Sequence, residues 1–318
     1  MKIIEPSAKL VTGYEDKPEE LIELCGRICY DSQNKIAPGT AQEFCKMLFK
    51  NGHTSVFEHA NIILEVSWKV ECRLAWAARD YCIKTGLPSF LRFDRLDGIN
   101  HRRHFVSGNV RAWNNMFNSL SAGSWIGFPE CVLEALRVYP ALFDTRRWKQ
   151  KLRSSSGTKD FKAAVVLPSR LPKWARERHT TETFFITCDR GISHELVRHR
   201  AASFSQQSTR YCKANKSGEI EVIKPSGLKI SDEEFMASAD VDEYYEGLTE
   251  CAKVPPQTAR YVLPTCLATK LYMTMTLERW RDFLKLRTSL AAHPDMRVIA
   301  KQIQRQLFPD EIGDSNAD

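Results

Sequence analysis

The chain of 318 residues carries 46 Lys or Arg against 39 Asp or Glu, a formal net charge of +7, and 43% of its residues are hydrophobic. This is the composition of a globular protein long enough to bury a substantial core, as one large domain or two modest ones. No run of about 18 apolar residues occurs, so no membrane span is expected. The ten cysteines contain no Cys-x-x-Cys pair. We therefore expect neither a disulfide framework nor a metal site, and a cytoplasmic location.

The N-terminal part of the chain predicts two helices and a strand. Residues 17–31 show an apolar stripe at helical spacing. Thr40 and Glu43 have the spacing of a capping box, which predicts a second helix that ends at Gly52. Residues 60–70 partly alternate and are rich in Ile, Val and Trp, which favours a strand.

The middle of the chain is less periodic and strongly basic. Residues 145–178 hold eleven Lys or Arg and two acids, a net charge of +9 where the whole chain has +7. The segment Ser154-Ser155-Ser156-Gly157 within it is typical of a turn. Two interpretations stay open for this basic segment: a surface that meets nucleic acid or a polyphosphate, and a solvated loop.

The C-terminal part predicts a strand followed by helices. Residues 180–187 have strand character, and Asp189 is placed to cap a helix that continues to about Arg200. Ser231 and Glu234 predict another capped helix. Two further helices are expected over residues 269–287 and 294–307.

Residues 198–211 are the segment best suited to a ligand. They read Arg-His-Arg-Ala-Ala-Ser-Phe-Ser-Gln-Gln-Ser-Thr-Arg-Tyr, with three arginines, one histidine and three serines, and without an acid. Guanidinium groups hold phosphate oxygens bidentately, and hydroxyls and loop amides supply further donors. We therefore expect a phosphate-bearing ligand here, and room for more than one.

Three other features have weaker ligand-binding character. Residues 52–59, Gly-His-Thr-Ser-Val-Phe-Glu-His, offer two imidazoles, two hydroxyls and a carboxylate, although turn chemistry with one packed histidine explains them as well. Arg260 and Arg287 flank an expected helix, and an arginine at the favourable end of the helix dipole explains Arg287 equally. Of the cysteines, Cys266 has the setting most suggestive of a nucleophile, but a packed thiol is the plainer interpretation.

Arg198-His199-Arg200 followed by Ser208-Thr209-Arg210-Tyr211 resembles the signature of the flavin-dependent thymidylate synthases. Similar segments extend through the chain, at residues 27–30, 52–59, 189–197, 259–264 and 286–297. The resemblance implies an α/β (α+β) fold in which helices flank a central, mostly antiparallel sheet. It also implies one domain over residues 1–318, with a basic insertion at about 71–178.

The same resemblance implies an activity. The family makes dTMP from dUMP by reductive methylation, with FAD as redox relay, NADPH as reductant and methylenetetrahydrofolate as carbon donor. It implies a homotetramer with active sites shared between subunits, and no nucleic-acid or membrane partner. A bacterial source, or a phage whose protein works in the host cytoplasm, fits the family.

The resemblance also assigns residues by position. Those expected to hold dUMP are Glu195, Arg198, Gln206, Gln207, Ser208, Thr209, Arg210, Arg260 and Arg287. Those expected to contact FAD are Ser55, Arg198, His199, Arg200, Gln206, Thr276 and Asp282. Arg287 is the expected catalytic residue, because a fixed cation beside the ionised uracil N3 activates C5.

Two positions depart from the family pattern. Thr276 stands where the family usually has Asn, and Asp282 stands where it has Asn or His. A carboxylate near the pyrophosphate of FAD disfavours binding of the cofactor. Two alternatives therefore stay open: the same scaffold acting by hydroxymethylation of dUMP or on another pyrimidine nucleotide, and a nucleic-acid-binding relative with a decayed active site.

Overall fold

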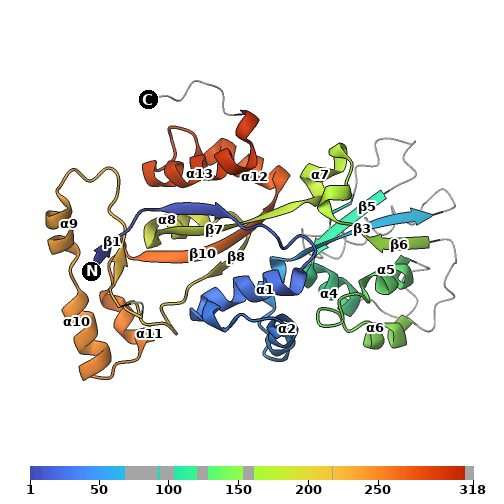
Figure 1. Ribbon diagram of the computed structural model, residues 1–318, viewed down its shortest axis with the longest axis horizontal. Coiled ribbons are helices and arrows are strands. Elements are labelled where there is room, and N and C mark those ends of the chain that lie inside the picture. The colour runs from blue at the N-terminus through green and yellow to red at the C-terminus, as the bar shows by residue number, and fades with distance from the viewer. Residues whose placement is uncertain (69–91, 94–103, 120–127, 153–160, 217, 312–318) are drawn as a thin grey trace.

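The computed structural model describes most of the chain as two antiparallel sheets flanked by helices (Figure 1). The described residues are 1–68, 92–93, 104–119, 128–152, 161–216 and 218–311. The arrangement confirms the expected α/β class. The turn expected at Ser154-Ser155-Ser156-Gly157 lies outside the described residues.

The first sheet has four strands in the order β2-β7-β10-β8, and every neighbouring pair is antiparallel. Its strands are β2 (Ser7–Leu10), β7 (Thr181–Asp189), β10 (Ala268–Thr276) and β8 (Ser203–Gln206). A short parallel pair lies beside it, β1 (Lys2–Ile3) with β9 (Glu221–Val222).

The second sheet has the order β4-β5-β3-β6 and is also antiparallel. Its strands are β4 (Arg92–Phe93), β5 (His104–Asn109), β3 (Asn61–Trp68) and β6 (Phe161–Val165). Three of these strands come from the segment expected to be an insertion. They pair with β3 or with one another, so the inserted chain shares a sheet with the N-terminal part.

Helices cover both faces of the first sheet. Figure 1 shows α12 and α13 on its upper side and α1 and α2 on its lower side. The α-helices are α1 (Pro18–Arg27), α2 (Thr40–Lys50), α4 (Val110–Ser119), α5 (Phe128–Leu136), α6 (Thr145–Leu152), α7 (Lys173–His179), α8 (Arg190–Leu196), α9 (Asp232–Ala239), α10 (Asp242–Glu246), α11 (Pro256–Ala259), α12 (Leu277–Arg287) and α13 (Pro294–Leu307). The short helical turns used below are η1 (Ile28–Tyr30), η3 (Thr54–Glu58) and η6 (Arg260–Val262).

Apolar spacing explains why the helices lie where they do. In α13, Met296, Ile299, Ala300 and Ile303 are fully buried at intervals of one to four residues, which is one face of a helix. They pack with α12 and strands β7 and β10 in one core cluster. A second cluster joins α1, α2 and η3 to β3 and α4, so the two sheets lie on adjoining cores.

Several predicted elements are confirmed. The strands expected at 60–70 and 180–187 are β3 and β7. Ser231 and Glu234 form the expected capping box with both reciprocal hydrogen bonds, and the last predicted helix is α13. The first predicted helix starts at Pro18 and ends in a 3₁₀ turn.

Other predictions were wrong. Residues 268–276 form a central strand, not the start of a helix. Leu and Met are also good helix formers and the strand runs directly into α12, so sequence patterns alone extend that helix over the segment. The capping box at Thr40 does not form: Gly39 occupies the cap position, and the Thr40 hydroxyl donates to Glu23 instead. The helix expected to reach Arg200 ends at Leu196.

Candidate functional site

The segment 198–211 begins just after α8, contains β8 and ends in the turn that follows β8. It lies at one corner of the first sheet. Asp189 fixes the start of α8, because its Oδ1 accepts a hydrogen bond from the Ile192 amide at 2.9 Å. The helix is short, so Arg198, His199 and Arg200 lie in the turn beyond it. β8 then pairs with β10 and anchors the other side of the segment to the sheet.

Three of the predicted site residues meet in one hydrogen-bonded network. Arg287, at the end of α12, donates through Nη1 to Glu195 Oε2 at 2.9 Å and through Nε to His199 Nε2 at 3.0 Å. The Phe283 ring packs edge-on against His199, with centroids 4.9 Å apart. The Arg287 side chain is 18% exposed, so its guanidinium is oriented by two partners and still reaches solvent on one side.

The His199 imidazole is neutral at physiological pH. Burial lowers its pKa, the neighbouring Arg287 lowers it further, and Glu195 acts in the opposite direction. Because Nε2 accepts from Arg287, we assign the ring proton to Nδ1. His199 therefore adds no positive charge beside Arg287 and serves as its acceptor.

The remaining arginines of the segment are exposed and uncompensated. In the described part of the chain, no carboxylate pairs with Arg198, Arg200 or Arg210. Among the described residues, the Arg210 guanidinium donates only to the neutral Gln257 side-chain oxygen, at 3.3 Å, and it lies over the Tyr211 ring. Exposed guanidinium groups of this kind are ready to pair with phosphate.

Gln207, Ser208 and Thr209 line a small cavity of about 70 Å³ next to these arginines. The Gln207 amide donates to the Lys270 carbonyl at 2.9 Å, which holds the segment against β10. Gln206 points its amide nitrogen inward, to Ser193 and Thr269, both at 3.1 Å. The backbone here is therefore anchored while the hydroxyls line the cavity.

Four predicted residues lie outside both this network and segment 198–211 in the described part of one chain. Ser55, in η3, and Arg260, in η6, are both exposed. Thr276 is fully buried, and its hydroxyl caps α12 by accepting from the Arg279 amide. Asp282 is exposed and pairs with Arg279 at 2.9 Å. Their assigned roles at the cofactor and nucleotide stay predictions.

One buried histidine ties the segment 52–59 to the sheet. His59 is fully buried between Thr274, 2.7 Å from Nδ1, and Ser205, 2.9 Å from Nε2. Burial lowers its pKa to about 3, so it stays neutral. The sequence named this residue only as part of a polar motif, because partners this distant in the chain leave no local signal.

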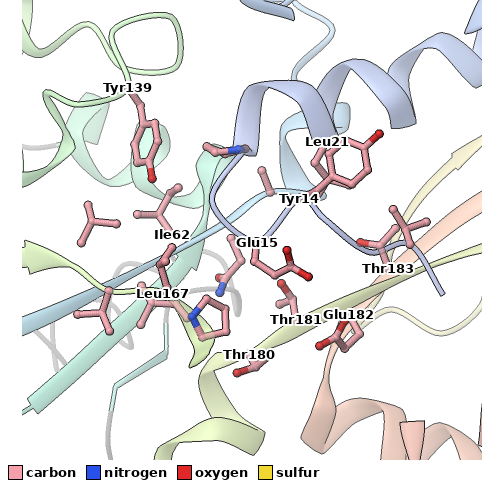
Figure 2. Close-up of a pocket in the computed structure, with 18 residues that line it drawn as sticks. Tyr14, Glu15, Leu21, Ile62, Tyr139, Leu167, Thr180, Thr181, Glu182 and Thr183 are labelled. Carbon is pink, nitrogen blue, oxygen red and sulfur yellow. The ribbon is translucent and has the colours of Figure 1, made fainter. Parts of the chain in front are cut away.

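A cavity of about 60 Å³ that the sequence did not indicate lies between the two sheets, lined by residues of β3, β6 and β7. Figure 2 shows Glu15, Thr181 and Glu182 on one side of it and Tyr139 on the other. Burial, reinforced by Glu15, raises the pKa of Glu182 to about 7. The sequence could not indicate it, because Glu182 sits within a strand pattern and Glu15 far from it in the chain.

Cys266, a weaker candidate from the sequence analysis, has the structural setting of a packed thiol. Cys266 is half-buried, and burial raises the pKa of its thiol, which opposes a role as nucleophile. Among the described residues, no group of three or more His, Cys, Asp or Glu is arranged to hold a metal ion. The described helices are all too short or too polar to cross a bilayer.

The chain has an α/β fold with an arginine-rich segment suited to anions, and the comparisons with known proteins specify its family. Residues 10–74 and 155–309 match the family described as "Thymidylate synthase complementing protein". This match covers more than half of the chain, and the chain belongs to that family.

Individual relatives match over shorter stretches. The flavin-dependent thymidylate synthase of Thermococcus onnurineus is 34% identical over 139 residues, which are 42% of this chain and 56% of the relative. That of Saccharolobus solfataricus is 37% identical over 145 residues, 42% of this chain and 55% of the relative. The chain thus spans about half the length of the curated relatives it matches.

A solved structure is also similar. It is the flavin dependent thymidylate synthase ThyX from Helicobacter pylori, complexed with FAD and dUMP. It is 25% identical and has a TM-score of 0.35, over 43% of this chain and 75% of that one.

Proposed function

We propose that this protein is a flavin-dependent thymidylate synthase of the cytoplasm, which converts dUMP to dTMP by reductive methylation. Methylenetetrahydrofolate would donate the carbon and NADPH the reducing equivalents, and FAD would supply the redox chemistry when bound. The observation that carries this proposal is the Arg287–Glu195–His199 network beside the uncompensated arginines of segment 198–211. The family membership supports it.

The network suits the activation of a pyrimidine. Arg287 is held in a fixed direction by Glu195 and by a neutral acceptor, His199. A guanidinium fixed before the reaction stabilises negative charge that develops on the uracil N3 without first having to reorient. Negative charge at N3 enriches C5, the carbon that receives the methyl group.

The surrounding residues suit binding of two phosphorylated ligands. Arg210 and the Ser208 hydroxyl would hold the phosphate of dUMP, and the hydroxyl accepts from the Arg210 backbone amide at 3.2 Å, which keeps the two residues together. The exposed Arg198 and Arg200 fit the pyrophosphate of FAD, because they carry two charges without a carboxylate partner in the described chain. Both ligands would share one segment.

We also propose a homotetramer with shared active sites. Ser55, Arg260 and Asp282 are exposed and make no described contact with the Arg287 network of their own chain. A second subunit could bring the same residues to that network from outside. The proposal needs only that these exposed side chains face a neighbouring copy.

We propose that residues 1–318 are one domain with an insertion at about 71–178. The family match leaves residues 75–154 unmatched. β5 and β6 pair with β3, and α4 packs in the same core cluster as α1 and α2. These contacts support an insertion that completes a sheet of the domain and does not fold apart from it.

The decisive experiment is mass analysis of the product formed from dUMP, methylenetetrahydrofolate, NADPH and FAD. We expect dTMP, from a yellow protein whose colour is lost when NADPH is added without oxygen. A product heavier than dTMP by one oxygen would show hydroxymethylation instead. A colourless protein that forms no product and binds oligonucleotides with a steep salt dependence would favour the nucleic-acid-binding alternative.

A further inference from the structure

A cavity of about 610 Å³ lies between α2, η3, α4 and α6. Its volume is in the range of small-molecule sites, roughly 300–1,000 Å³. Figure 1 shows α2, α4 and α6 along the lower side of the molecule, whereas α12, which carries Arg287, lies along the upper side. Within one chain the cavity is therefore separate from the site built around Arg287, and Ser55, the expected FAD contact on η3, does not line it.

The rim of this cavity is positively charged. Arg146 and Arg147, in the first turn of α6, are exposed, and no carboxylate pairs with either side chain in the described part of the chain. Lys46 adds a third positive charge. Its ion pair among the described residues is with Glu43, at 2.6 Å, and solvent weakens this exposed pair. The acid that lines the cavity, Asp144, accepts from the Arg147 amide at 3.1 Å and is thereby engaged at the start of α6.

One wall of the cavity, formed by Asn114 and Asn118 of α4, offers hydrogen bonds of both kinds. The Asn114 amide nitrogen donates to the Val110 and Leu142 carbonyls, at 2.9 and 3.1 Å, which leaves its oxygen to accept. The Asn118 oxygen accepts from the Trp148 indole at 3.2 Å, which leaves its amide group to donate. Asn114 and Asn118 lie one helical turn apart on the same face of α4, so this face offers both an acceptor and a donor to polar atoms of a nucleobase.

The floor of the cavity is apolar and aromatic. Phe49 stacks on the fully buried Phe57 with ring centroids 4.0 Å apart, and Phe49 itself is only partly buried. Trp148 stacks on Phe117 at 4.7 Å and forms another wall. A planar ring can therefore lie against an aromatic surface while a charged group reaches the arginine rim.

We propose that this cavity is a second ligand site, which binds a nucleoside polyphosphate with its phosphates on Arg146 and Arg147 and its base against the asparagine wall. Both arginines belong to the basic segment 145–178, for which a polyphosphate surface and a solvated loop were open interpretations. The site is one cavity of about 610 Å³, which favours one small molecule over nucleic acid, because nucleic acid needs a continuous basic groove. The site is additional to the dUMP and FAD positions of the proposed function.

The test is calorimetric titration of the full-length protein with ATP, and separately with inorganic tripolyphosphate. We expect saturable ATP binding that is tighter than tripolyphosphate binding, because the asparagine wall and Phe49 contact the base. The double substitution Arg146→Ala/Arg147→Ala should weaken ATP binding at least ten-fold. The matched control Lys162→Ala/Arg170→Ala removes the same charge from exposed positions of the same basic segment. It should change the affinity for ATP less than two-fold.

Arg210→Ala separates this site from the proposed active site and should also leave ATP binding within two-fold. Thermal melts monitored by circular dichroism check that each variant is folded. The proposal is overturned by the absence of saturable ATP binding, by equal weakening in both double variants, or by loss of binding in Arg210→Ala. Displacement of ATP by FAD would likewise overturn it, since the cavity would then be part of the cofactor site. Tighter binding of a single-stranded oligonucleotide than of ATP would assign the basic segment to nucleic acid.

Discussion

Both the network around Arg287 and the cavity between α2, η3, α4 and α6 contain arginines, but the partners of these arginines differ. Arg287 is fixed by Glu195 and His199 and is mostly buried, whereas Arg146 and Arg147 extend from α6 without a carboxylate partner in the described chain. A pre-oriented cation stabilises charge that develops during a reaction, while exposed, unpaired cations mainly add affinity for an anion. The geometry therefore suits the first region to chemistry and the second to binding.

The strongest test of this difference is Arg287→Ala. Because its proposed role is activation, we expect kcat to fall by roughly 10²–10³-fold while the Kd for dUMP rises by about ten-fold or less. Single-turnover kinetics and equilibrium dUMP binding measure the two effects, with Lys285→Ala on the exposed face of the same helix as control. Equal losses in binding and turnover would remove the distinction between the two regions.

The next largest expected effect is on the free energy of unfolding, and it comes from Glu182 in the cavity between the two sheets. The folded-state pKa of Glu182 is about 7 and the unfolded value is about 4.5, so between these values the folded protein holds a proton that the unfolded chain releases. Glu182 therefore destabilises the protein as pH rises from about 4.5 through 7. We expect Glu182→Gln to raise the free energy of unfolding at pH 8 by roughly 2–3 kcal/mol and to change it little at pH 4.5.

Urea unfolding at the two pH values measures this effect. Glu233→Gln, an exposed substitution on α9 with the same chemistry, is the control and should show no such pH dependence. If Glu182→Gln were equally stabilising at both pH values, burial of an ionised carboxylate would not be its cause.

Arg210→Ala tests whether the exposed arginines of segment 198–211 act by affinity. Loss of one charge-assisted phosphate contact costs about 2 kcal/mol, so we expect the Kd for dUMP to rise about thirty-fold. kcat at saturating dUMP should change less than three-fold. A fall in kcat as large as that of Arg287→Ala would place Arg210 with the reacting groups, and Arg137→Ala, an exposed arginine on another surface, is the control.

The smallest expected effect is at Asp282. Its carboxylate is exposed and paired with Arg279, so most of its charge is already compensated. We expect Asp282→Asn to tighten FAD binding by about two- to five-fold, since it removes a negative charge and frees Arg279 to face the pyrophosphate. Flavin fluorescence titration measures this, with Glu233→Gln as control. Unchanged or weaker FAD binding would argue against Asp282 being near the cofactor.

Local patterns in the sequence correctly predicted the elements whose signals lie within a few residues of one another. Ser231 and Glu234 bond each other at a helix start, and the apolar face of 294–307 is one continuous stripe. The polar segment 198–211 was recognisable because its arginines and hydroxyls are consecutive. The strand β10 was missed because its Leu and Met residues are also good helix formers and it continues directly into α12.

By itself, then, the sequence determined the helix cap at Ser231, the strands β3 and β7, the arginine-rich segment 198–211 and the resemblance to a family that the comparisons confirm. The tertiary structure decided which side chains meet: Arg287 with Glu195 and His199, and His59 with Thr274 and Ser205. It also decided that Arg146 and the asparagines of α4 line one cavity. The physical reason is distance along the chain. Capping and amphipathic spacing act over a few residues, whereas these contacts join segments that only core packing and strand pairing bring together.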